Sequence, residues 1–264
     1  MNRKPYPSDL TELQWDNIEH LFPPAKTGGR PREYDNRDLV NGILYVTRSG
    51  CSWRMLPHGF PPWQSVYGYF RRWRRAGLWK EIHDSLVVTI RQLDGREAQP
   101  SAAILDSQSV KTTEQGGPHG YDAEKKVNGR KRHILVDALG LLLAIVVHPA
   151  NIQDRDGAKL VLEKVRRQLP RLQLIWADGG YAGSLVQWVQ KRCGWLLQTV
   201  LRPVGVKGFV ILPRRWVVER TFGWLGRYRR LSKDYERLPD TSETLIYIAM
   251  IHRMSRYLLK EPAS

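Results

Sequence analysis

Three acidic residues stand in sequence contexts that suit metal-ion chemistry. Asp106 ends the apolar segment "AAILD", and Asp178 ends a second apolar segment, "LQLIWAD". Short apolar runs of this kind predict buried strands. When two such strands are parallel neighbours, their carboxyl ends lie at the same edge of the sheet, where ligands bind. Two carboxylates held together there repel each other unless a proton or a cation lies between them.

Glu219 is the third acid, and it lies within the strongly basic segment "RRWVVERTFGWLGRYRR". This segment predicts a helix that opens at Pro213, because proline suits a first helical turn. Arg215 precedes Glu219 by one turn, so a surface ion pair of roughly 0.3–0.5 kcal/mol is the simplest interpretation. The alternative is that Glu219 joins the two aspartates in one site, and the charge of the whole chain favours this alternative.

Three carboxylates would suit Mg²⁺ or Mn²⁺, because hard oxygen ligands bind hard cations. Two such ions roughly 4 Å apart activate an attacking oxygen and stabilise the leaving oxygen in phosphodiester chemistry. We therefore predict that Asp106, Asp178 and Glu219 are catalytic residues and the ligands of two metal ions.

The composition of the chain favours a nucleic-acid partner. Its 264 residues carry a formal net charge of +16 and a sequence pI near 10.1, and phosphate-rich partners are the natural targets of so basic a surface. No apolar run approaches the roughly 20 residues needed to span a bilayer, so we expect no membrane association. Cys51 and Cys193 match no metal or disulfide spacing, which predicts a reducing, cytoplasmic setting.

Residues 1–95 predict a helical DNA-binding domain. Thr11 and Gln14 form a capping box at the start of the first helix. Further helices are expected over 36–49, where Gly50 follows, from about Pro62 to Ala76, and over 78–93. The order of helix, tight turn and basic helix is typical of helix-turn-helix proteins.

The third of these helices, "WQSVYGYFRRWRRAG", combines an apolar face with a basic one. Helical spacing predicts that its core-facing residues are Val66, Tyr69, Phe70 and Trp73. A solvated basic face is the simple alternative for the arginines, but their density favours DNA contacts. The predicted DNA-contacting residues of this helix are Arg71, Arg72, Arg74 and Arg75.

We predict that residues 96–101 form a linker and that residues 102–264 form an α/β catalytic domain. Apolar strands over 132–137 and 141–148 form a hairpin, and later helices alternate with buried strands. This order predicts a mixed sheet with helices on both faces. The glycine-rich basic segment 116–132 predicts a loop that contacts DNA, with Lys131 and Arg132 at its end.

Other polar residues of this domain have simpler interpretations. Asp137 stands in the turn "DALG", where aspartate commonly caps a hairpin. Asp154 and Asp156 precede a predicted helix and are typical N-cap residues. His133 is expected to be a core or surface histidine with satisfied hydrogen bonds.

These motifs together resemble the DDE transposases of bacterial insertion sequences, in the four/five-like group that contains insertion sequence five. The resemblance covers nearly the whole chain. "LTELQWDNIEHLFP" and "LVNGILYVTRSGCSWRMLP" resemble the N-terminal region of the family. "DSQSVKTT" and "ADGGYAG" match its two aspartate motifs, and "RRWVVERTFGWLGRYRRLSKDYE" matches its glutamate motif.

The resemblance implies an RNase H-like, retroviral-integrase-like core in which Asp106, Asp178 and Glu219 bind two Mg²⁺ or Mn²⁺ ions. It implies metal-dependent cleavage at the ends of the element and strand transfer into target DNA. Arg215 fills the arginine position of the family's glutamate signature, which helps to bind DNA near the cut. Leu212 stands at its tyrosine position and Gly226 at its basic position, where Arg227 is the nearest substitute.

Two other functions stay open at this point. One is an RNase H-like nuclease that cuts DNA without joining it, and the other is a DNA-binding regulator without catalysis. Both ends of an element must be brought together for transposition, so we expect a homodimer or a larger assembly on double-stranded DNA.

Overall fold

The structure is a computed structural model that describes residues 3–24, 32–200 and 215–258. The chain forms two compact units. The first comprises residues 1–96, 227–232 and 244–264, and the second comprises 97–226 and 233–243. The predicted linker 96–101 begins where the first unit gives way to the second. The grouping of 227–232 and 244–264 with the N-terminal residues differs from the predicted range of 102–264.

The first unit is helical, as predicted, and local capping signals set its helices. The N-terminal helices are α1 (Glu12–Glu19), α2 (Asn36–Ser49), η1 (Trp53–Met55), α3 (Trp63–Arg75) and α4 (Leu78–Leu93). The Thr11 side chain accepts from the Gln14 backbone while the Gln14 side chain accepts in return, which confirms the capping box. Gly50 ends α2 and Gly77 separates α3 from α4, each with a φ of 77° that favours glycine. Later in the chain come η3 (Arg229–Leu231) and α8 (Pro239–Tyr257).

An aromatic cluster forms the core of this unit. The ring of Phe22 lies 5.4 Å from that of Trp73 and 5.9 Å from that of Trp79. The Trp73 and Trp79 rings are 5.6 Å apart and close to perpendicular, a geometry that aromatic quadrupoles favour. Val66, Phe70 and Trp73 are buried, as the helical spacing predicted, whereas Tyr69 is half-buried. These contacts fix which face of α3 points away from the core.

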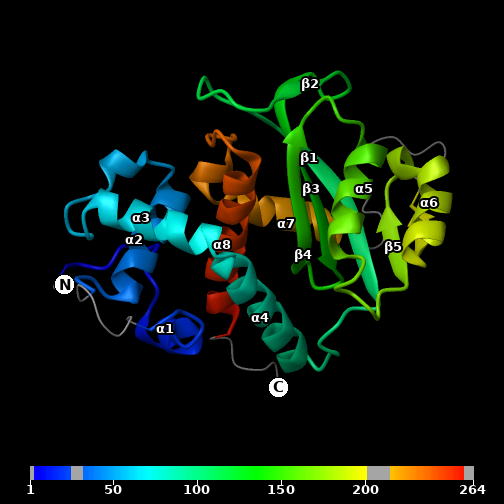
Figure 1. Ribbon diagram of the computed structural model, residues 1–264. Helices are drawn as coiled ribbons and strands as arrows, with labels where there is room; N and C mark the ends of the chain where they lie inside the picture. Colours follow the sequence, from blue (N-terminus) through cyan, green and yellow to red (C-terminus); the bar gives the residue numbers. More distant parts are fainter. Residues whose placement is uncertain (1–2, 25–31, 201–214, 259–264) are drawn as a thin grey trace. The chain divides into compact units, whose positions relative to one another are not determined.

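The second unit contains a six-stranded mixed sheet (Figure 1). Its strands are β1 (Ala102–Lys111), β2 (Gly120–Asp122), β3 (Val127–Asp137), β4 (Leu142–Pro149), β5 (Leu174–Ala177) and β6 (Leu196–Thr199). The strand order is β2-β3-β1-β5-β6, and β4 pairs with β3. The hairpin strands pair antiparallel, whereas β1–β5 and β5–β6 pair parallel, as predicted. Asp137 closes the hairpin turn by accepting from the backbone N–H groups of Leu139 and Leu141, each at 2.9 Å.

Helices cover both faces of this sheet, which confirms the predicted α/β architecture. Helices α5 (Asp154–Val165) and α6 (Ser184–Cys193) lie on one side, and α7 (Arg215–Gly226) lies on the other (Figure 1). The N-cap of α5 is Gln153, so the predicted N-cap role of Asp154 is wrong. The Asp154 side chain instead contacts Lys131 and Ser107. The helix that carries Glu219 was predicted to begin at Pro213, which lies outside the described residues.

Strand β1 is longer than predicted, and Asp106 lies in its middle rather than at its end. The parallel pairing of β1 with β5 stops at Ile104 and Trp176. Residues 107–111 continue the strand because each pairs antiparallel with β3, from Ser107 opposite His133 to Lys111 opposite Gly129. The local sequence of this extension is polar, so long-range pairing rather than hydrophobic pattern holds it in the sheet.

Arg130 on β3 holds the returning segment 233–237 against the sheet. Its guanidinium is fully buried and lies 3.2 Å from the Asp234 carboxylate. It donates to the backbone carbonyls of Glu236, Arg237 and Pro118, each at 2.7 Å. Because all these acceptors converge on one buried cation, the segment forms part of the second unit although it follows α7 in the chain.

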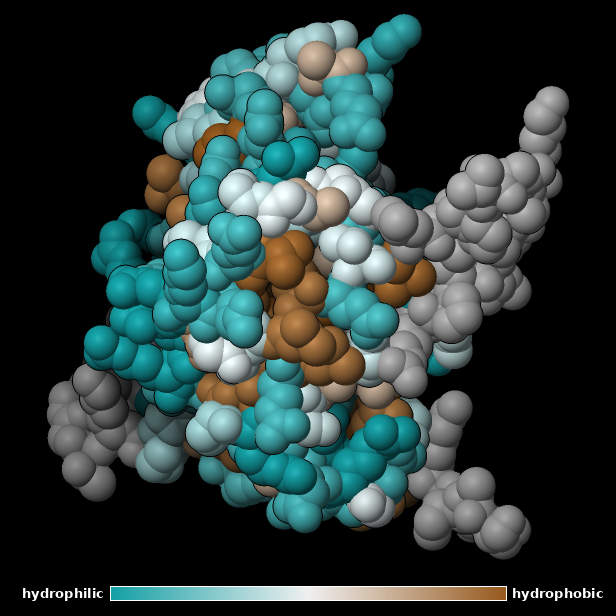
Figure 2. Space-filling view, turned by 90° about the vertical axis from the view of Figure 1, so that its right-hand side faces the viewer, coloured by the Kyte–Doolittle hydropathy of each residue, from teal (hydrophilic) through white to brown (hydrophobic). Residues whose placement is uncertain are grey.

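One face of the molecule carries an apolar patch, and no described helix is long and apolar enough to cross a membrane. Figure 2 shows apolar residues gathered in the middle of one face, with hydrophilic residues around them. Leu160 on α5 and Leu196 on β6 are exposed apolar side chains of the second unit.

Candidate active site

Asp106 and Asp178 lie at equivalent positions of two neighbouring parallel strands. Ile104 and Trp176 form the last parallel pair of β1 and β5, and each aspartate lies two residues beyond its member of that pair. The Asp178 carboxylate caps the short helix η2 (Gly179–Tyr181) by accepting from the Gly180 N–H at 2.9 Å. The Asp106 carboxylate accepts from the Ser107 N–H at 2.7 Å. The sheet register therefore brings the two carboxyl groups to one edge.

Helix α7 brings Glu219 to the same place, together with Arg215. The Nη2 atom of Arg215 lies 3.9 Å from Asp106 Oδ2, 3.8 Å from Asp178 Oδ2 and 3.8 Å from Glu219 Oε1. The exposed fractions of the three acidic side chains are 16%, 34% and 50% in the same order. Three carboxylates from three different elements thus surround a single cationic nitrogen, and Asp106 is the most enclosed of them.

Burial makes Asp106 the acid whose charge is least favourable. Loss of hydration, together with the nearby Asp178 charge, raises the pKa of Asp106 from 3.8 to about 6. The Ser107 N–H, the Arg215 guanidinium and the Lys125 ammonium oppose this shift and lower the pKa. A carboxyl group with this balance depends on neighbouring cations to remain ionised near neutral pH.

A hydrogen-bond network links the residues next to the two aspartates. Ser107 follows Asp106 in β1, and Tyr181 closes η2 after Asp178. The Tyr181 hydroxyl donates to His133 Nε2 on strand β3 at 2.9 Å. The Ser107 hydroxyl also donates to Asp154 Oδ1 at 3.1 Å, and the Lys125 ammonium donates to the Ser107 carbonyl at 3.3 Å. These contacts tie Tyr181 to β3 and Ser107 to α5, next to the acids.

Two buried histidines continue this network into the core. His148 Nδ1 lies 2.9 Å from the Pro149 carbonyl, which only accepts, so this nitrogen carries the proton. Its Nε2 therefore accepts from His133 Nδ1 at 2.8 Å, and His133 Nε2 in turn accepts from the Tyr181 hydroxyl at 2.9 Å. Burial, with the neighbouring His148, lowers the pKa of His133 from 6.5 to about 3, so both rings are held neutral. His133 is the satisfied core histidine that the sequence predicted.

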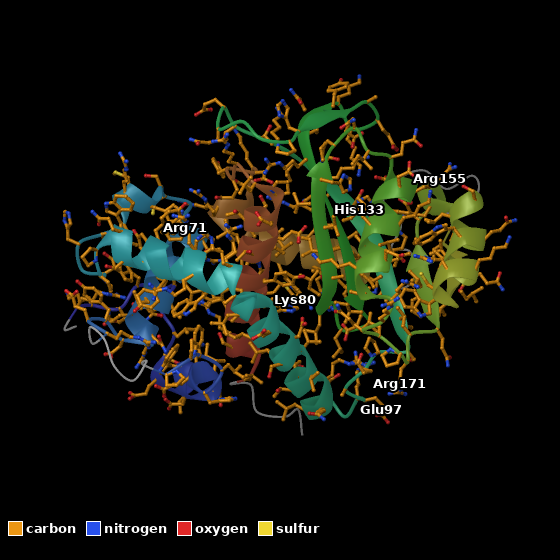
Figure 3. All side chains as sticks on the ribbon, in the orientation of Figure 1. Arg71, Lys80, Glu97, His133, Arg155 and Arg171 are labelled. Atoms are coloured by element: carbon orange, nitrogen blue, oxygen red, sulfur yellow. The ribbon has the colours of Figure 1, made fainter. Side chains whose placement is uncertain are left out.

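Gly157 on α5 makes room for the histidine pair. A Cβ atom at this position would lie 2.5 Å from ring atoms of both His133 and His148. Figure 3 shows His133 on its strand and Arg155 near the start of α5. Any larger residue at Gly157 would therefore push α5 away from the network that supports the acids.

A cavity of about 400 Å³ adjoins this network in the second unit. Its lining includes the charged side chains of Asp122, Lys131, Asp154 and Arg155, together with Gly180 of η2. Arg155 donates to the Gly180 carbonyl at 3.2 Å. The cavity thus lies beside the loop that begins at Asp178, and its polar lining suits a polar substrate group.

The oxygen donors of the site fit a hard divalent cation. Three carboxylates already face one positive charge, and carboxylate oxygens are the preferred ligands of Mg²⁺ and Mn²⁺. Within the described residues, no three acidic, histidine or cysteine side chains lie close enough together to hold a metal ion as they stand.

Comparison with known families identifies the family of the chain. Residues 97–254 match the transposase DDE domain family. The chain belongs to this family. Residues 10–83 also match the family described as "Putative transposase of IS4/5 family". Both matches agree with the group that the motifs resemble, and the chain is a DDE transposase of the insertion sequence four/five group.

Proteins of insertion elements are among the relatives of this transposase. The uncharacterized 16.2 kDa protein of insertion element IS402 from Burkholderia cepacia is 32% identical over 39% of this chain and 72% of its own length. The "Putative transposase for insertion sequence element IS402" of the same organism is 30% identical over 47% of this chain and 61% of its own length. Uncharacterized protein y4sN of Sinorhizobium fredii is 27% identical over 46% of this chain.

The predicted DNA-contacting arginines of α3 lie on the outer side of that helix. Arg71, Arg72 and Arg75 are exposed, and Arg74 is half-buried. The Arg71 guanidinium lies 5.7 Å from the ring of Tyr67, and that of Arg72 lies 4.7 Å from the ring of Tyr69. These cation–π contacts hold the arginines over the helix without removing their charge from solvent.

Lys131 and Arg132, which were predicted to lie at the end of a DNA-contacting loop, are buried. Both are buried on β3, because this strand starts earlier than predicted and takes up part of the expected loop. Lys131 pairs with Asp154 at 2.9 Å, and Arg132 donates to the Lys233 carbonyl at 3.1 Å. Burial lowers the pKa of Arg132 to about 10. Both side chains thus make their polar contacts inside the protein.

The two remaining predicted basic residues fall into different units. Arg215 lies among the acids, and Arg227 is exposed in the first unit, where its backbone carbonyl accepts from Arg48 at 2.7 Å. Leu212 lies outside the described residues. Sequence reasoning missed Ser107, Tyr181 and Lys125, although Ser107 and Tyr181 stand inside the aspartate motifs "DSQSVKTT" and "ADGGYAG".

Proposed function

We propose that this transposase cleaves DNA at the ends of an insertion sequence and joins the released 3′-hydroxyl to target DNA. The observation that supports this proposal is the meeting of Asp106, Asp178 and Glu219 around one cation. A structural ion-pair network would not require acids from two sheet strands and a crossing helix. Such a cluster is what phosphodiester chemistry with divalent ions needs.

Asp106, Asp178 and Glu219 would hold one or two Mg²⁺ or Mn²⁺ ions, which supply Lewis-acid activation of the attacking oxygen and charge stabilisation of the leaving one. Asp178 is fixed by its N-cap bond to Gly180, and Asp106 by the Ser107 N–H, so two of the ligands are oriented before any ion binds. The hydrogen-bond network behind them keeps these orientations. No covalent intermediate on the protein is needed, because water and then the 3′-hydroxyl attack directly.

DNA would be held in part by the first unit. The exposed arginines of α3 neutralise phosphates and release counterions, which gives affinity without sequence information. Two element ends must be held at once for strand transfer, so we propose a homodimer or larger assembly on double-stranded DNA. The apolar patch of Figure 2 is a surface that such an assembly could cover.

The decisive experiment measures single-turnover cleavage and strand joining by Glu219→Gln. If Glu219 binds metal, the rate falls at least about a hundredfold while folding is unaffected. If Glu219 serves only its i,i+4 ion pair with Arg215, stability changes by a few tenths of a kcal/mol and activity survives. Glu163→Gln is the matched control, because Glu163 forms an ion pair with Arg192 on the surface of the same unit.

The substrates of this experiment separate the proposed function from its alternatives. A labelled duplex that carries an element end reports cleavage, and a supercoiled target plasmid reports joining. Cleavage without joining would favour a nuclease. Specific binding without cleavage in Mg²⁺ or Mn²⁺ would favour a DNA-binding regulator, and equal rates for the wild type and Glu219→Gln would remove Glu219 from the site.

A further inference from the structure

Arg215 occupies the point at which the three acids meet. Its Nη2 atom lies 3.8 to 3.9 Å from one oxygen of each carboxylate. Hydrogen bonds of the N–H···O type span about 2.7–3.2 Å, so these three contacts are charge–charge contacts without a fixed direction. The guanidinium therefore compensates the acids without being bonded tightly to any one of them.

The acids need such compensation when no metal ion is bound. Asp106 is mostly buried, and the Asp178 and Asp106 charges repel each other. Arg215 opposes both effects, because its positive charge lies 3.9 Å from Asp106 Oδ2 and 3.8 Å from Asp178 Oδ2. Its single positive charge leaves the three carboxylates only partly neutralised, whereas a divalent ion carries twice that charge.

We propose that Arg215 is the resident cation of this carboxylate cluster in the metal-free protein, and that a divalent metal ion displaces it. The inference rests on the proposed function, because it takes the three acids as metal ligands. The same oxygen atoms that face Arg215 would have to face the ion, and one set of oxygens cannot serve both cations at contact distance. The arginine and the metal ion are therefore competitors.

The displacement has a consequence for substrate binding. A guanidinium that leaves the acids stays beside them, because α7 fixes its backbone one turn from Glu219. There it can donate two hydrogen bonds to a phosphate, which it could not do while surrounded by carboxylates. Metal loading would therefore prepare Arg215 for DNA, and the binding of metal and of DNA would be linked.

Neighbouring cations do not fill this role. The Lys125 ammonium also lowers the pKa of Asp106, but it is bonded to the carbonyl and hydroxyl of Ser107. Arg155 lies beside the site and donates to the Gly180 carbonyl. Arg155 thus offers a control that removes the same charge nearby without touching the acids.

Manganese binding to the full chain without DNA tests the proposal. The dissociation constant for Mn²⁺, from electron paramagnetic resonance of the free ion, is compared for wild type, Arg215→Gln, Arg215→Lys and Arg155→Gln. Loss of the competing charge should tighten Mn²⁺ binding about tenfold or more in Arg215→Gln. Arg215→Lys should stay closer to wild type, and Arg155→Gln should change the constant less than about threefold. Circular dichroism confirms that each variant is folded.

The outcomes separate this inference from the function on which it rests. Equal or weaker Mn²⁺ binding by a folded Arg215→Gln, with wild-type binding that depends on Asp106, would overturn the displacement and leave the metal site intact. Wild-type binding that Asp106→Asn does not alter would instead refute the metal site itself.

Chemical labelling gives a second measurement that needs no variant. An arginine-specific dicarbonyl reagent, read by mass spectrometry of the peptide that contains Arg215, reports access to the guanidinium. Adding Mn²⁺ should raise labelling of Arg215 severalfold relative to chelator and leave that of Arg155 unchanged. Labelling of Arg215 that stays constant or falls on metal addition would contradict displacement.

Discussion

Replacing Asp106 by asparagine should raise the free energy of unfolding of the metal-free protein. The same replacement should abolish DNA cleavage when metal ions are supplied. Burial raises the pKa of Asp106 from 3.8 to about 6 in the folded protein. One pKa unit corresponds to 1.36 kcal/mol, so the charged carboxylate destabilises the folded state by about 3 kcal/mol. An amide of the same shape keeps the hydrogen bond from the Ser107 N–H without carrying that charge.

The pH dependence of this gain has a definite sign. A raised pKa means that the folded state keeps its proton to a higher pH than the unfolded state does. The free energy of unfolding of the wild type therefore falls as pH rises from 3.8 to about 6, and the full penalty is present above pH 6. The advantage of Asp106→Asn should accordingly be about 3 kcal/mol at pH 8 and below about 1 kcal/mol at pH 4.

Urea titrations with a chelator present measure this difference at both pH values. Asp156→Asn is the control, because Asp156 is exposed on α5 and only pairs with Lys159. The reasoning would be refuted if Asp106→Asn were no more stable than wild type at pH 8, or if its advantage were the same at pH 4. Cleavage by the same preparation shows whether the stabilising change also removes the activity.

Two further predictions concern the histidine network and the basic helix. Because burial lowers the pKa of His133 to about 3, stability that is complete above pH 6.5 is lost as pH falls below that value. At pH 5 the charging cost of His133 should lower the free energy of unfolding by about 2 kcal/mol. Urea titrations at pH 7 and pH 5 should therefore show a smaller decrease for His133→Asn than for the wild type. An equal decrease in both proteins would contradict the lowered pKa of His133. In gel-shift titrations, DNA affinity should fall and its salt dependence flatten when alanine replaces four arginines together, and an unchanged salt slope would exclude α3 as the contact. These arginines are Arg71, Arg72, Arg74 and Arg75.

The helices of the first unit were predictable because their signals are local. The capping box of Thr11 and the left-handed glycines at Gly50 and Gly77 act within one helical turn, so a reader of the sequence sees every interacting residue. The extension of β1 beyond Asp106 carries no such signal. Its residues stay in the sheet because β3 pairs with them.

The burial of basic residues on β3 was invisible for the same reason. Arg130 and Arg132 find their partners 106 and 101 residues away, at Glu236 and Lys233. Because these partners are so distant in the sequence, the basic residues were predicted to be exposed and to contact DNA. The two aspartates could be chosen because each follows an apolar run, but the sequence alone could not place Arg215 among all three acids. Helix α7 had to be packed on β1 before that arrangement existed.

The interrupted course of the chain affects how the protein is made. All three acids have been synthesised once the ribosome passes Glu219. The carbonyl that Arg130 donates to belongs to Arg237, 107 residues after Arg130, and is synthesised later. Ribosomes add roughly 5–20 residues per second, so the sheet remains unfinished for seconds after its last strand has been synthesised. A nascent chain in that interval has its aspartate strands but lacks the segment that locks β3. Ribosome-bound chains stopped before residue 233 should therefore be protease-sensitive and inactive. Release of the longer chain allows segment 233–237 to pack against β3.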